Sequence, residues 1–295
     1  PWDHSDTGID KRWLAEDLKR ALAAAVGPDC SFEGCSSCGV CGPDLGHNVA
    51  IAPPPVPPAL PRRAPASDRL QRLRFGFAKA GSLALISHLD TLRMLERALR
   101  RTGLPVSFTG GFHPLPRLQL ALPLPLGVEG HGEWLDLELV APVPAAEARE
   151  RLQAELPEGF RLLSVAEVPV FGPSLSQELA EAHWRFTLRP PAGTSAADPA
   201  AWQRAIADLL ATDPLPWHDT DKKGRPRQRD CRPYLLELMA GPFEADCASL
   251  SLRAAIDPQG RSLRPEQISA WLGEGLSLPL QLAAVRREVL CLAAC

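Results

Sequence analysis

The stretch Glu133-Trp-Leu-Asp-Leu-Glu-Leu139 sets the pattern from which the fold of this chain follows. Leucines recur at every second position, 135, 137 and 139, with Asp136 and Glu138 between them. Because successive side chains of a strand point to opposite faces, the leucines share one face. We predict a half-buried strand with an acidic outer face. Glu133, Asp136 and Glu138 resemble a metal-binding set, but alternate positions fall on opposite faces, so we interpret them mostly as strand surface.

The same kind of reading extends outward from this strand in both directions. Residues 72–79 alternate as a strand does, and Ser87-His-Leu-Asp90 resembles a capping box that opens a helix. Gly103 suits the end of that helix, and residues 145–156 form a second helix after Pro144. With extended pieces around 106–122 and 160–165, the order is β-α-β-β-α-β, the split βαβ arrangement.

The C-terminal part of the chain repeats that order. Asp198 and Pro199 are an N-cap and a first helical residue, so a helix is expected from there to Leu210. We predict a mixed α+β fold with two ferredoxin-like (β-α-β-β-α-β) units, at residues 69–172 and 180–295. The further strands and helix are expected at 183–188, 235–239, 249–256, 265–272 and 280–290.

A cysteine cluster, Cys30-Ser-Phe-Glu-Gly-Cys35-Ser-Ser-Cys38-Gly-Val-Cys41, lies ahead of these units. Its C-x4-C-x2-C-x2-C spacing lets four thiolates converge on one metal centre, while nearby glycines allow tight turns. An iron–sulfur cluster (4Fe-4S) uses such steps, and zinc accepts the same four thiolates. We favour an iron–sulfur cluster as the occupant of this site, with zinc as the alternative metal. The remaining interpretation is that the four cysteines are unrelated free thiols.

Helix and linker signals surround the cysteines. An apolar stripe from Trp13 to Val26 predicts one amphipathic helix, which needs a partner to bury that stripe. Residues 43–68 are rich in proline and are expected to be an extended linker, so residues 1–42 form a separate tail. The chain has no initiator Met, and we expect the true protein to begin further upstream.

Composition bounds the function classes. The 295 residues carry a net charge of −3, which argues against coating by nucleic acid but permits a local basic patch. No apolar run approaches the roughly 20 residues that span a bilayer, and no signal peptide precedes the helix. We expect a cytoplasmic protein without membrane partners, in a compartment where clustered cysteines hold metal more often than they form disulfides.

A ligand site is predicted in the first unit. His88 stands at the start of a helix, where the dipole keeps its imidazole neutral, and His113 stands in a rigid turn between glycines and a proline. A pair of this kind can do general acid–base work on a phosphodiester such as RNA, but we favour structural hydrogen bonds as the role of both residues. No catalytic residue is assigned. The predicted substrate-binding residues are His88, Asp90, Gly110, Gly111, His113 and Arg117.

The densest basic run predicts a nucleic-acid contact. It comprises Lys222, Lys223, Arg225, Arg227 and Arg229, which could grip RNA phosphates. No aromatic residue lies inside the run to stack bases, so a solvated mobile loop is the competing interpretation.

Several of these motifs together resemble a known family. Ser87-His-Leu-Asp90, Gly110-Gly-Phe-His-Pro114, Pro123-Leu-Pro-Leu-Gly127 and Asp230-Cys-Arg-Pro233 resemble the radical SAM-linked protein family, a bacterial domain of unknown function, over roughly 70–290. The opening Pro1-Trp-Asp-His-Ser-Asp-Thr-Gly8 and the cysteines are similar to the C-terminal end of a cobalamin-binding-type radical SAM protein. The resemblance implies one fused polypeptide.

The chain departs from that family in one respect. A radical SAM enzyme uses a C-x3-C-x2-C loop, and the sequence contains no such spacing. The resemblance therefore implies an accessory, substrate-recruiting portion, partnered by an upstream radical SAM domain, and RNA is the substrate that we expect it to recruit. The alternative is a stand-alone RNA-binding module with a structural zinc site.

Overall fold

The computed structural model describes residues 8–41, 52, 55, 66–192, 194, 198–220, 224–244 and 247–293. The chain divides into two compact units, Pro1–Arg63 and Ala64–Cys295. The first unit holds helix α1 (Lys11–Leu22), whose N-cap is Asp10. No helix among the described residues is long and apolar enough to cross a membrane.

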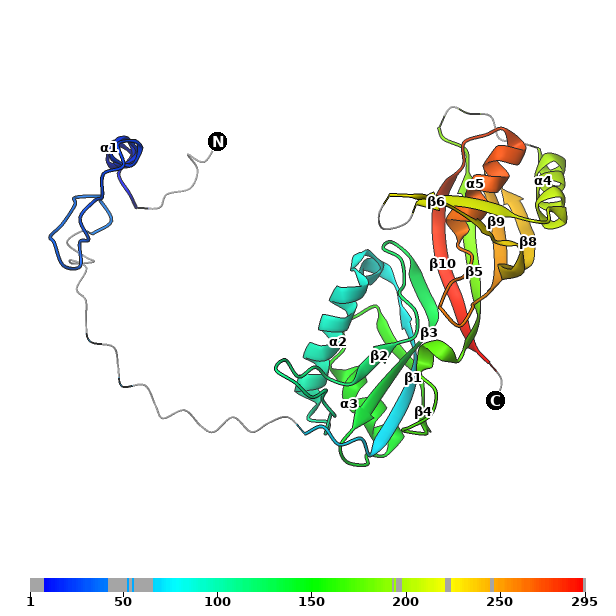
Figure 1. Ribbon diagram of the computed structural model, residues 1–295, viewed down its shortest axis with the longest axis horizontal. Coiled ribbons are helices and arrows are strands. Elements are labelled where there is room, and N and C mark those ends of the chain that lie inside the picture. The colour runs from blue at the N-terminus through cyan, green and yellow to red at the C-terminus, as the bar shows by residue number, and fades with distance from the viewer. Residues whose placement is uncertain are drawn as a thin grey trace. The chain divides into compact units, whose positions relative to one another are not determined.

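The first half of the larger unit has the predicted order of elements (Figure 1). Its strands lie in the order β4-β1-β3-β2, and every neighbouring pair is antiparallel. The elements are β1 (Gln71–Lys79), the short 3-10 helix η1 (Gly81–Leu85), α2 (His88–Thr102), β2 (Leu118–Leu120), β3 (Glu129–Leu139), α3 (Ala145–Ala154) and β4 (Phe160–Val168).

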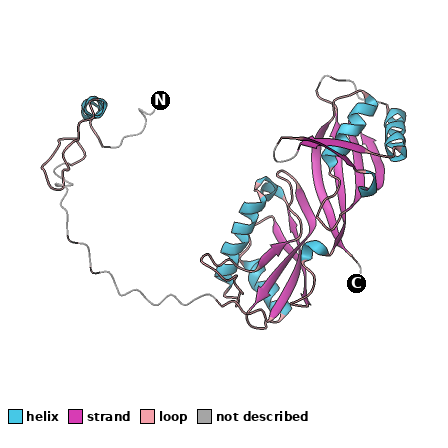
Figure 2. Ribbon diagram, in the orientation of Figure 1, coloured by secondary structure: helices cyan, strands magenta, loops and turns pink. Residues whose placement is uncertain are grey.

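The second half repeats this arrangement with one addition. Its main strands lie in the order β10-β5-β9-β8, again with antiparallel neighbours, while β6 and β7 form a separate two-stranded sheet (Figure 2). The elements are η2 (Leu175–Gln177), β5 (Leu179–Arg189), α4 (Pro199–Ala211), β6 (Pro216–Thr220), β7 (Pro226–Asp230), η3 (Arg232–Tyr234), β8 (Leu235–Glu244), β9 (Cys247–Ala255), α5 (Pro265–Leu276) and β10 (Gln281–Leu292).

A short parallel pairing joins the halves into one eight-stranded sheet among the described residues. Arg286 and Arg287 of β10 pair with Glu129 and Gly130 of β3. Close approach depends on Gly132, because a Cβ there would lie 2.7 Å from the backbone oxygen of Glu288. The mixed α+β class is confirmed, with a mostly antiparallel sheet, and the finer assignment of two ferredoxin-like units stays a prediction.

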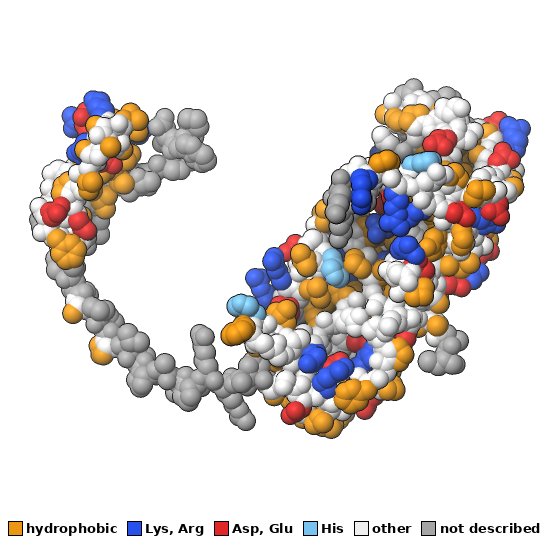
Figure 3. All heavy atoms as spheres, viewed as in Figure 1, with side chains coloured by type: hydrophobic (Ala, Val, Ile, Leu, Met, Phe, Trp, Pro, Cys, Tyr) orange, Lys and Arg blue, Asp and Glu red, His pale blue; other side chains and the backbone are white. Residues whose placement is uncertain are grey.

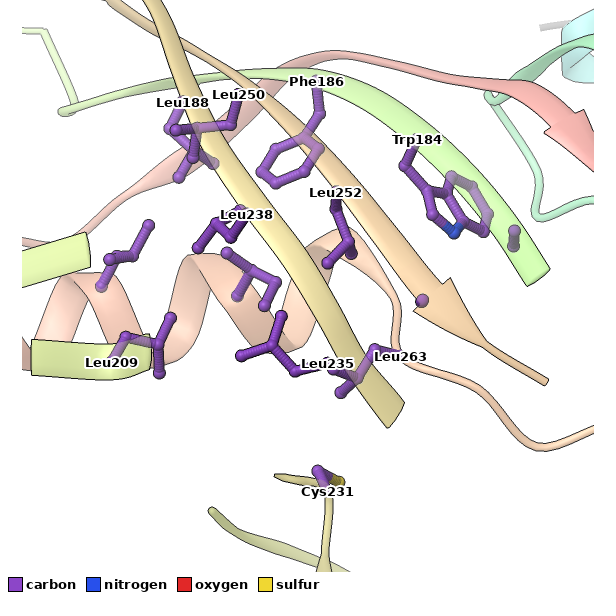
Figure 4. Packing of buried hydrophobic residues seen from close by; sticks show 14 of the residues in the cluster. Trp184, Phe186, Leu188, Leu209, Cys231, Leu235, Leu238, Leu250, Leu252 and Leu263 are labelled. Atoms are coloured by element: carbon purple, nitrogen blue, oxygen red, sulfur yellow. The ribbon is translucent and has the colours of Figure 1, made fainter. Parts of the chain in front are cut away.

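Each half has its own apolar core. In the first half, the three leucines of β3 are fully buried, which confirms the alternation, and they pack with Phe75 of β1 and Leu95 of α2. In the second half, Trp184 and Phe186 of β5 lie among leucines contributed by its other strands and by the segments around them (Figure 4). Helix α4 packs beside α5 over this core.

The predicted acidic outer face of β3 is wrong. Glu133 is 2% exposed and Asp136 is 3% exposed. The guanidinium groups of Arg72 and Arg74 bracket Asp136, and Arg72 also donates to the carbonyls of Pro169 and Pro173. The segment that follows β4 therefore covers this face, and paired charges replace the expected solvent.

Candidate nucleic-acid interface

Two arginines of the basic run lie in a strand of a hairpin. Arg227 and Arg229 lie in β7, where they pair with Asp219 and Trp217 of β6. Arg225 and Arg227 are exposed and Arg229 is half-buried. The two lysines of the run, at 222 and 223, lie outside the described residues. The hairpin supplies, from its opposite strand, the aromatic residue that the run lacks.

Aromatic contacts fix this hairpin to the body of the second half. The ring of Trp217 meets that of Trp271 on α5 edge-on, with 5.5 Å between centroids. The indole Nε1 of Trp271 donates to the carbonyl of Pro216, at 3.1 Å. Arg229 is ion-paired with Asp219 through one terminal nitrogen. These contacts hold the arginine and the tryptophan of the hairpin side by side.

A cleft of about 500 Å³ lies next to the hairpin. Arginines outnumber acidic residues along its walls, and Figure 3 shows Lys and Arg side chains gathered on a face of the second half. Arg261 is ion-paired with Asp257 at 2.6 Å, whereas Arg264 makes no ion pair within the described residues. The principal lining side chains are Trp184, Trp217, Arg229, Arg261, Ser262 and Arg264.

Three buried polar atoms of this lining have no hydrogen-bond partner among the described residues. They are Nε1 of Trp184, Nε of Arg229 and Oγ of Ser262. Two of the three, the indole and guanidinium nitrogens, can only donate. Buried polar atoms without a partner are uncommon in folded proteins, and all three of these atoms belong to residues that line this one cleft.

The cleft ends at a buried ion pair that joins the two halves. One terminal nitrogen of Arg287, Nη2, donates to the carboxylate of Glu133 at 2.6 Å, and Nε donates to it at 2.7 Å. Both side chains are almost completely buried. Arg287 also donates to the carbonyls of Leu122 and Pro123 and lies over the ring of Trp184 at 5.3 Å. Arg287 thus contacts strand β3 through Glu133, the loop that contains Leu122 and Pro123, and the indole of Trp184.

A smaller cavity of about 20 Å³ lies in the first half, lined in part by Lys79, His88, Thr91 and Glu133. Lys79 is 2% exposed, and its Nζ donates over 3.3 Å to Ile86 and 3.5 Å to Thr91. Burial lowers the pKa of Lys79, although the charge of Glu133 opposes the shift. Burial, followed by the charge of Lys79, lowers the pKa of His88 as well, which keeps its imidazole neutral near pH 7.

The remaining predicted ligand residues occupy separate places. Asp90 is exposed and serves the cap of α2, where its backbone nitrogen and carboxylate both contact Ser87. Gly110, Gly111 and His113 lie in an exposed turn. Within the described residues, no hydrogen bond or ion pair joins His113 to His88.

Arg117, the last residue of that predicted set, is half-buried beside Glu138, with 3.9 Å between Nε and the carboxylate. The substrate-binding assignment therefore stays a prediction. Three residues of the cleft are absent from the predicted set, and their signal in the sequence is weak: Trp184, Arg261 and Arg287. Each stands in an ordinary strand or loop pattern, and only the fold brings them together.

The cysteine loop lies in the smaller unit, against α1. The backbone nitrogen of Ser37 donates to Sγ of Cys35 at 3.3 Å, and that of Asp10 donates to the carbonyl of Cys38 at 2.7 Å. Trp13 of α1 anchors the loop through an indole bond of 2.8 Å to Ser36. Among the four cysteines, Cys38 is half-buried, and the exposed ones are Cys30, Cys35 and Cys41.

The donor chemistry of this loop fits a thiophilic metal, because an amide donating to sulfur stabilises a thiolate. The described residues nevertheless contain no group of three or more His, Cys, Asp or Glu side chains arranged to hold a metal ion. The iron–sulfur and zinc assignments therefore stay predictions.

Comparisons with known proteins identify a family. A family model described as an uncharacterized protein conserved in bacteria (DUF2344) matches residues 72–265. This confirms the predicted likeness to a bacterial family of unknown function, while the link to radical SAM proteins stays a prediction. No curated protein matches the chain.

Several solved structures are similar to the chain at low identity. A Cbf5-Nop10-Gar1 complex has a TM-score of 0.42 at 10% identity over 72% of this chain and 48% of that one. An H/ACA RNP bound to a substrate RNA containing 2′-deoxyuridine has a TM-score of 0.39 at 9% identity, over 72% and 46%. A protein of unknown function from Galdieria sulphuraria has a TM-score of 0.24 at 15% identity, over 72% and 96%. The chain thus spans about half the length of the first two.

Proposed function

The chain belongs to this family of uncharacterized bacterial proteins through residues 72–265, and we propose that it is the RNA-recruiting accessory portion of a radical SAM iron–sulfur protein. The observation that carries the RNA part is the hairpin β6–β7, in which Arg229 pairs with Trp217 at the edge of the cleft. Proteins bind single strands by combining cations for phosphates with aromatic rings for bases.

The charge distribution supports a local contact in a chain of net negative charge. Arg225 and Arg227 are exposed on the hairpin, and Arg261 and Arg264 line the cleft beside it. Arginine binds phosphate oxygens with a fork of donors, so this grouping favours a phosphate backbone over a neutral ligand.

Fluorescence anisotropy with a labelled 20-nucleotide single-stranded RNA tests this proposal. The double variant Arg225→Ala/Arg227→Ala is expected to weaken binding about tenfold and to reduce the salt slope by about 1.4, because two phosphate contacts are lost. The matched control is Arg93→Ala/Arg97→Ala, which removes two exposed arginines from α2. Equal losses in both variants, or no RNA binding by the parent chain, would contradict the proposal.

The metal part rests on the cysteine loop. We propose that Cys30, Cys35, Cys38 and Cys41 hold a 4Fe-4S cluster, supported by their spacing and by the amide of Ser37 that donates to sulfur. When bound, such a cluster supplies electron transfer or local stability. The residues of this chain provide the thiolates, the tight turns and the helix α1 against which the loop lies.

Anaerobic purification with iron, sulfide and zinc analysis separates the alternatives. A cluster predicts about equal iron and sulfide, both lost in Cys38→Ala, while Cys231→Ala serves as the control because that buried cysteine belongs to the other unit. Zinc without sulfide would replace the proposal with an RNA-binding module that has a structural zinc site.

A radical SAM domain is proposed as the partner. The apolar face of α1 supports it, because Leu14, Leu18 and Leu22 are 44%, 60% and 80% exposed. Co-purification of a separately tagged upstream radical SAM domain tests the contact. We expect Leu18→Glu/Leu22→Glu to abolish it and Arg12→Glu, on the same helix, to preserve it.

A further inference from the structure

We infer that the cleft of the second half receives one unpaired nucleotide of the RNA, with its phosphate group among Arg229, Arg261 and Arg264 and its base against Trp217. The inference rests on the proposed RNA binding and adds the size and chemistry of the group that enters the cleft.

The dimensions of the cleft limit its occupant. About 500 Å³ falls within the range of pockets that enclose small molecules, roughly 300 to 1,000 Å³, and accommodates one nucleotide. A duplex is far wider than such a pocket. A single strand can instead turn one base inward, since its bases are unpaired and free to stack on an aromatic ring.

The unpartnered donors define the chemistry of the occupant. Trp184 is 3% exposed, and its indole nitrogen has no acceptor among the residues that the structure describes. A buried donor without a partner is unfavourable, and a ligand that offers an oxygen removes that cost. Two further atoms of residues that line the cleft, Nε of Arg229 and Oγ of Ser262, also have no hydrogen-bond partner among the described residues. Phosphate oxygens and base carbonyls offer such an acceptor, whereas an apolar ligand does not.

The walls are held in place before any ligand arrives. Arg287 binds Glu133 and two carbonyls of the loop at Leu122 and Pro123, and it lies over the ring of Trp184. The hairpin on the opposite side is fixed by Trp271. A cleft arranged in this way loses little conformational entropy on binding, which favours recognition of a small group.

Indole NMR of the full chain labelled with ¹⁵N at tryptophan tests the inference. Uridine 5′-monophosphate is titrated, with inorganic phosphate and uridine as separate probes, and Trp184→Phe assigns the resonance. We expect the Trp184 indole resonance to shift saturably with the nucleotide. The Trp134 resonance is expected to stay fixed, because its Nε1 already donates to Leu290 at 2.7 Å.

A stacking variant supplies a second readout. Trp217→Leu is expected to weaken nucleotide binding about tenfold, since base stacking is lost, and Trp217→Phe is expected to restore most of it. The control is Phe171→Leu, which removes an exposed ring elsewhere in the unit, over which Arg69 lies.

The outcomes separate this inference from the proposed function. If RNA binds by anisotropy but neither RNA nor nucleotide shifts the Trp184 resonance, the nucleotide site is overturned while RNA binding stands. Equal shifts with inorganic phosphate and nucleotide also overturn it, leaving a simple anion site. Nucleotide binding without RNA binding overturns the proposed function and this inference together.

Discussion

The two halves of the larger unit share one strand order and differ in where their buried ion pairs and arginine-lined surfaces lie. The first half encloses Asp136 between Arg72 and Arg74, and only a cavity of about 20 Å³ lies beside its buried Lys79. The second half carries arginines at the rim of a cleft of about 500 Å³. The same strand order therefore supports a buried charge network around Asp136 in the first half and an arginine-lined cleft beside a hairpin in the second.

The structural origin of the difference is a single addition. Between α4 and β8, the second half contains the hairpin β6–β7, whose Trp217 and Arg229 form one wall of the cleft. In the first half, the corresponding segment between α2 and β2 contains the exposed turn at Gly110 and Gly111. The inserted hairpin therefore accounts for the position of this cleft in the second half.

The largest expected effect comes from the ion pair that joins the halves. Arg287→Met leaves the carboxylate of Glu133 buried without a partner, which costs about 3 to 5 kcal/mol of unfolding free energy. Urea denaturation followed by circular dichroism measures this cost. The double variant Arg287→Met/Glu133→Leu is expected to regain most of it, and the exposed Arg185→Met serves as control. A neutral single variant would show that the halves do not depend on this pair.

A steric change at the seam between the halves is expected to have an intermediate effect. In Gly132→Ala, the new Cβ lies 2.7 Å from the Glu288 backbone oxygen and 3.1 Å from Cα of Val289, so β3 and β10 must separate. Overpacking of this kind costs about 1 to 3 kcal/mol. Gly110→Ala is the control, since no atom lies within 4 Å of its added Cβ. Equal stability of the two variants in urea would refute a tight seam.

The smallest effect concerns pH and the buried amine. Because burial lowers the pKa of Lys79, the folded state holds fewer protons than the unfolded state between that pKa and 10.5. Unfolding free energy should therefore rise with pH across this window. Lys79→Met is expected to remove that rise and to add about 1 kcal/mol at neutral pH. The exposed Lys19→Met should leave the pH profile unchanged, and a parent chain whose stability is flat there would contradict the argument.

Local rules predicted much of this fold. Ser87 caps α2, Gly103 ends it in the left-handed conformation, and Asp198 with Pro199 opens α4, all as the sequence indicates. The leucine alternation of β3 also holds. Each of these features depends on side chains within a few positions along the chain, which a pattern can capture.

The site depended on partners that are distant in sequence. Glu133 is buried because Arg287 reaches it from a strand 154 residues away, and no spacing rule connects the two. The basic run contains no aromatic residue in sequence, and Trp217 becomes the neighbour of Arg229 only through the strand pairing of the hairpin. Charged residues on an alternating strand are ordinarily exposed, so only the tertiary contacts could reveal the buried network.

The position of β10 has a consequence for how this protein is made. This strand follows every other described strand in the chain, yet it lies between β3 and β5. Until residues 281–292 have joined the sheet, the edge of β5 that they cover and residues Glu129 and Gly130 of β3 lack their strand partner, open to pairing with other nascent chains. Translation thus passes through a stage at which the other described strands of this unit exist and the sheet between its two halves is incomplete.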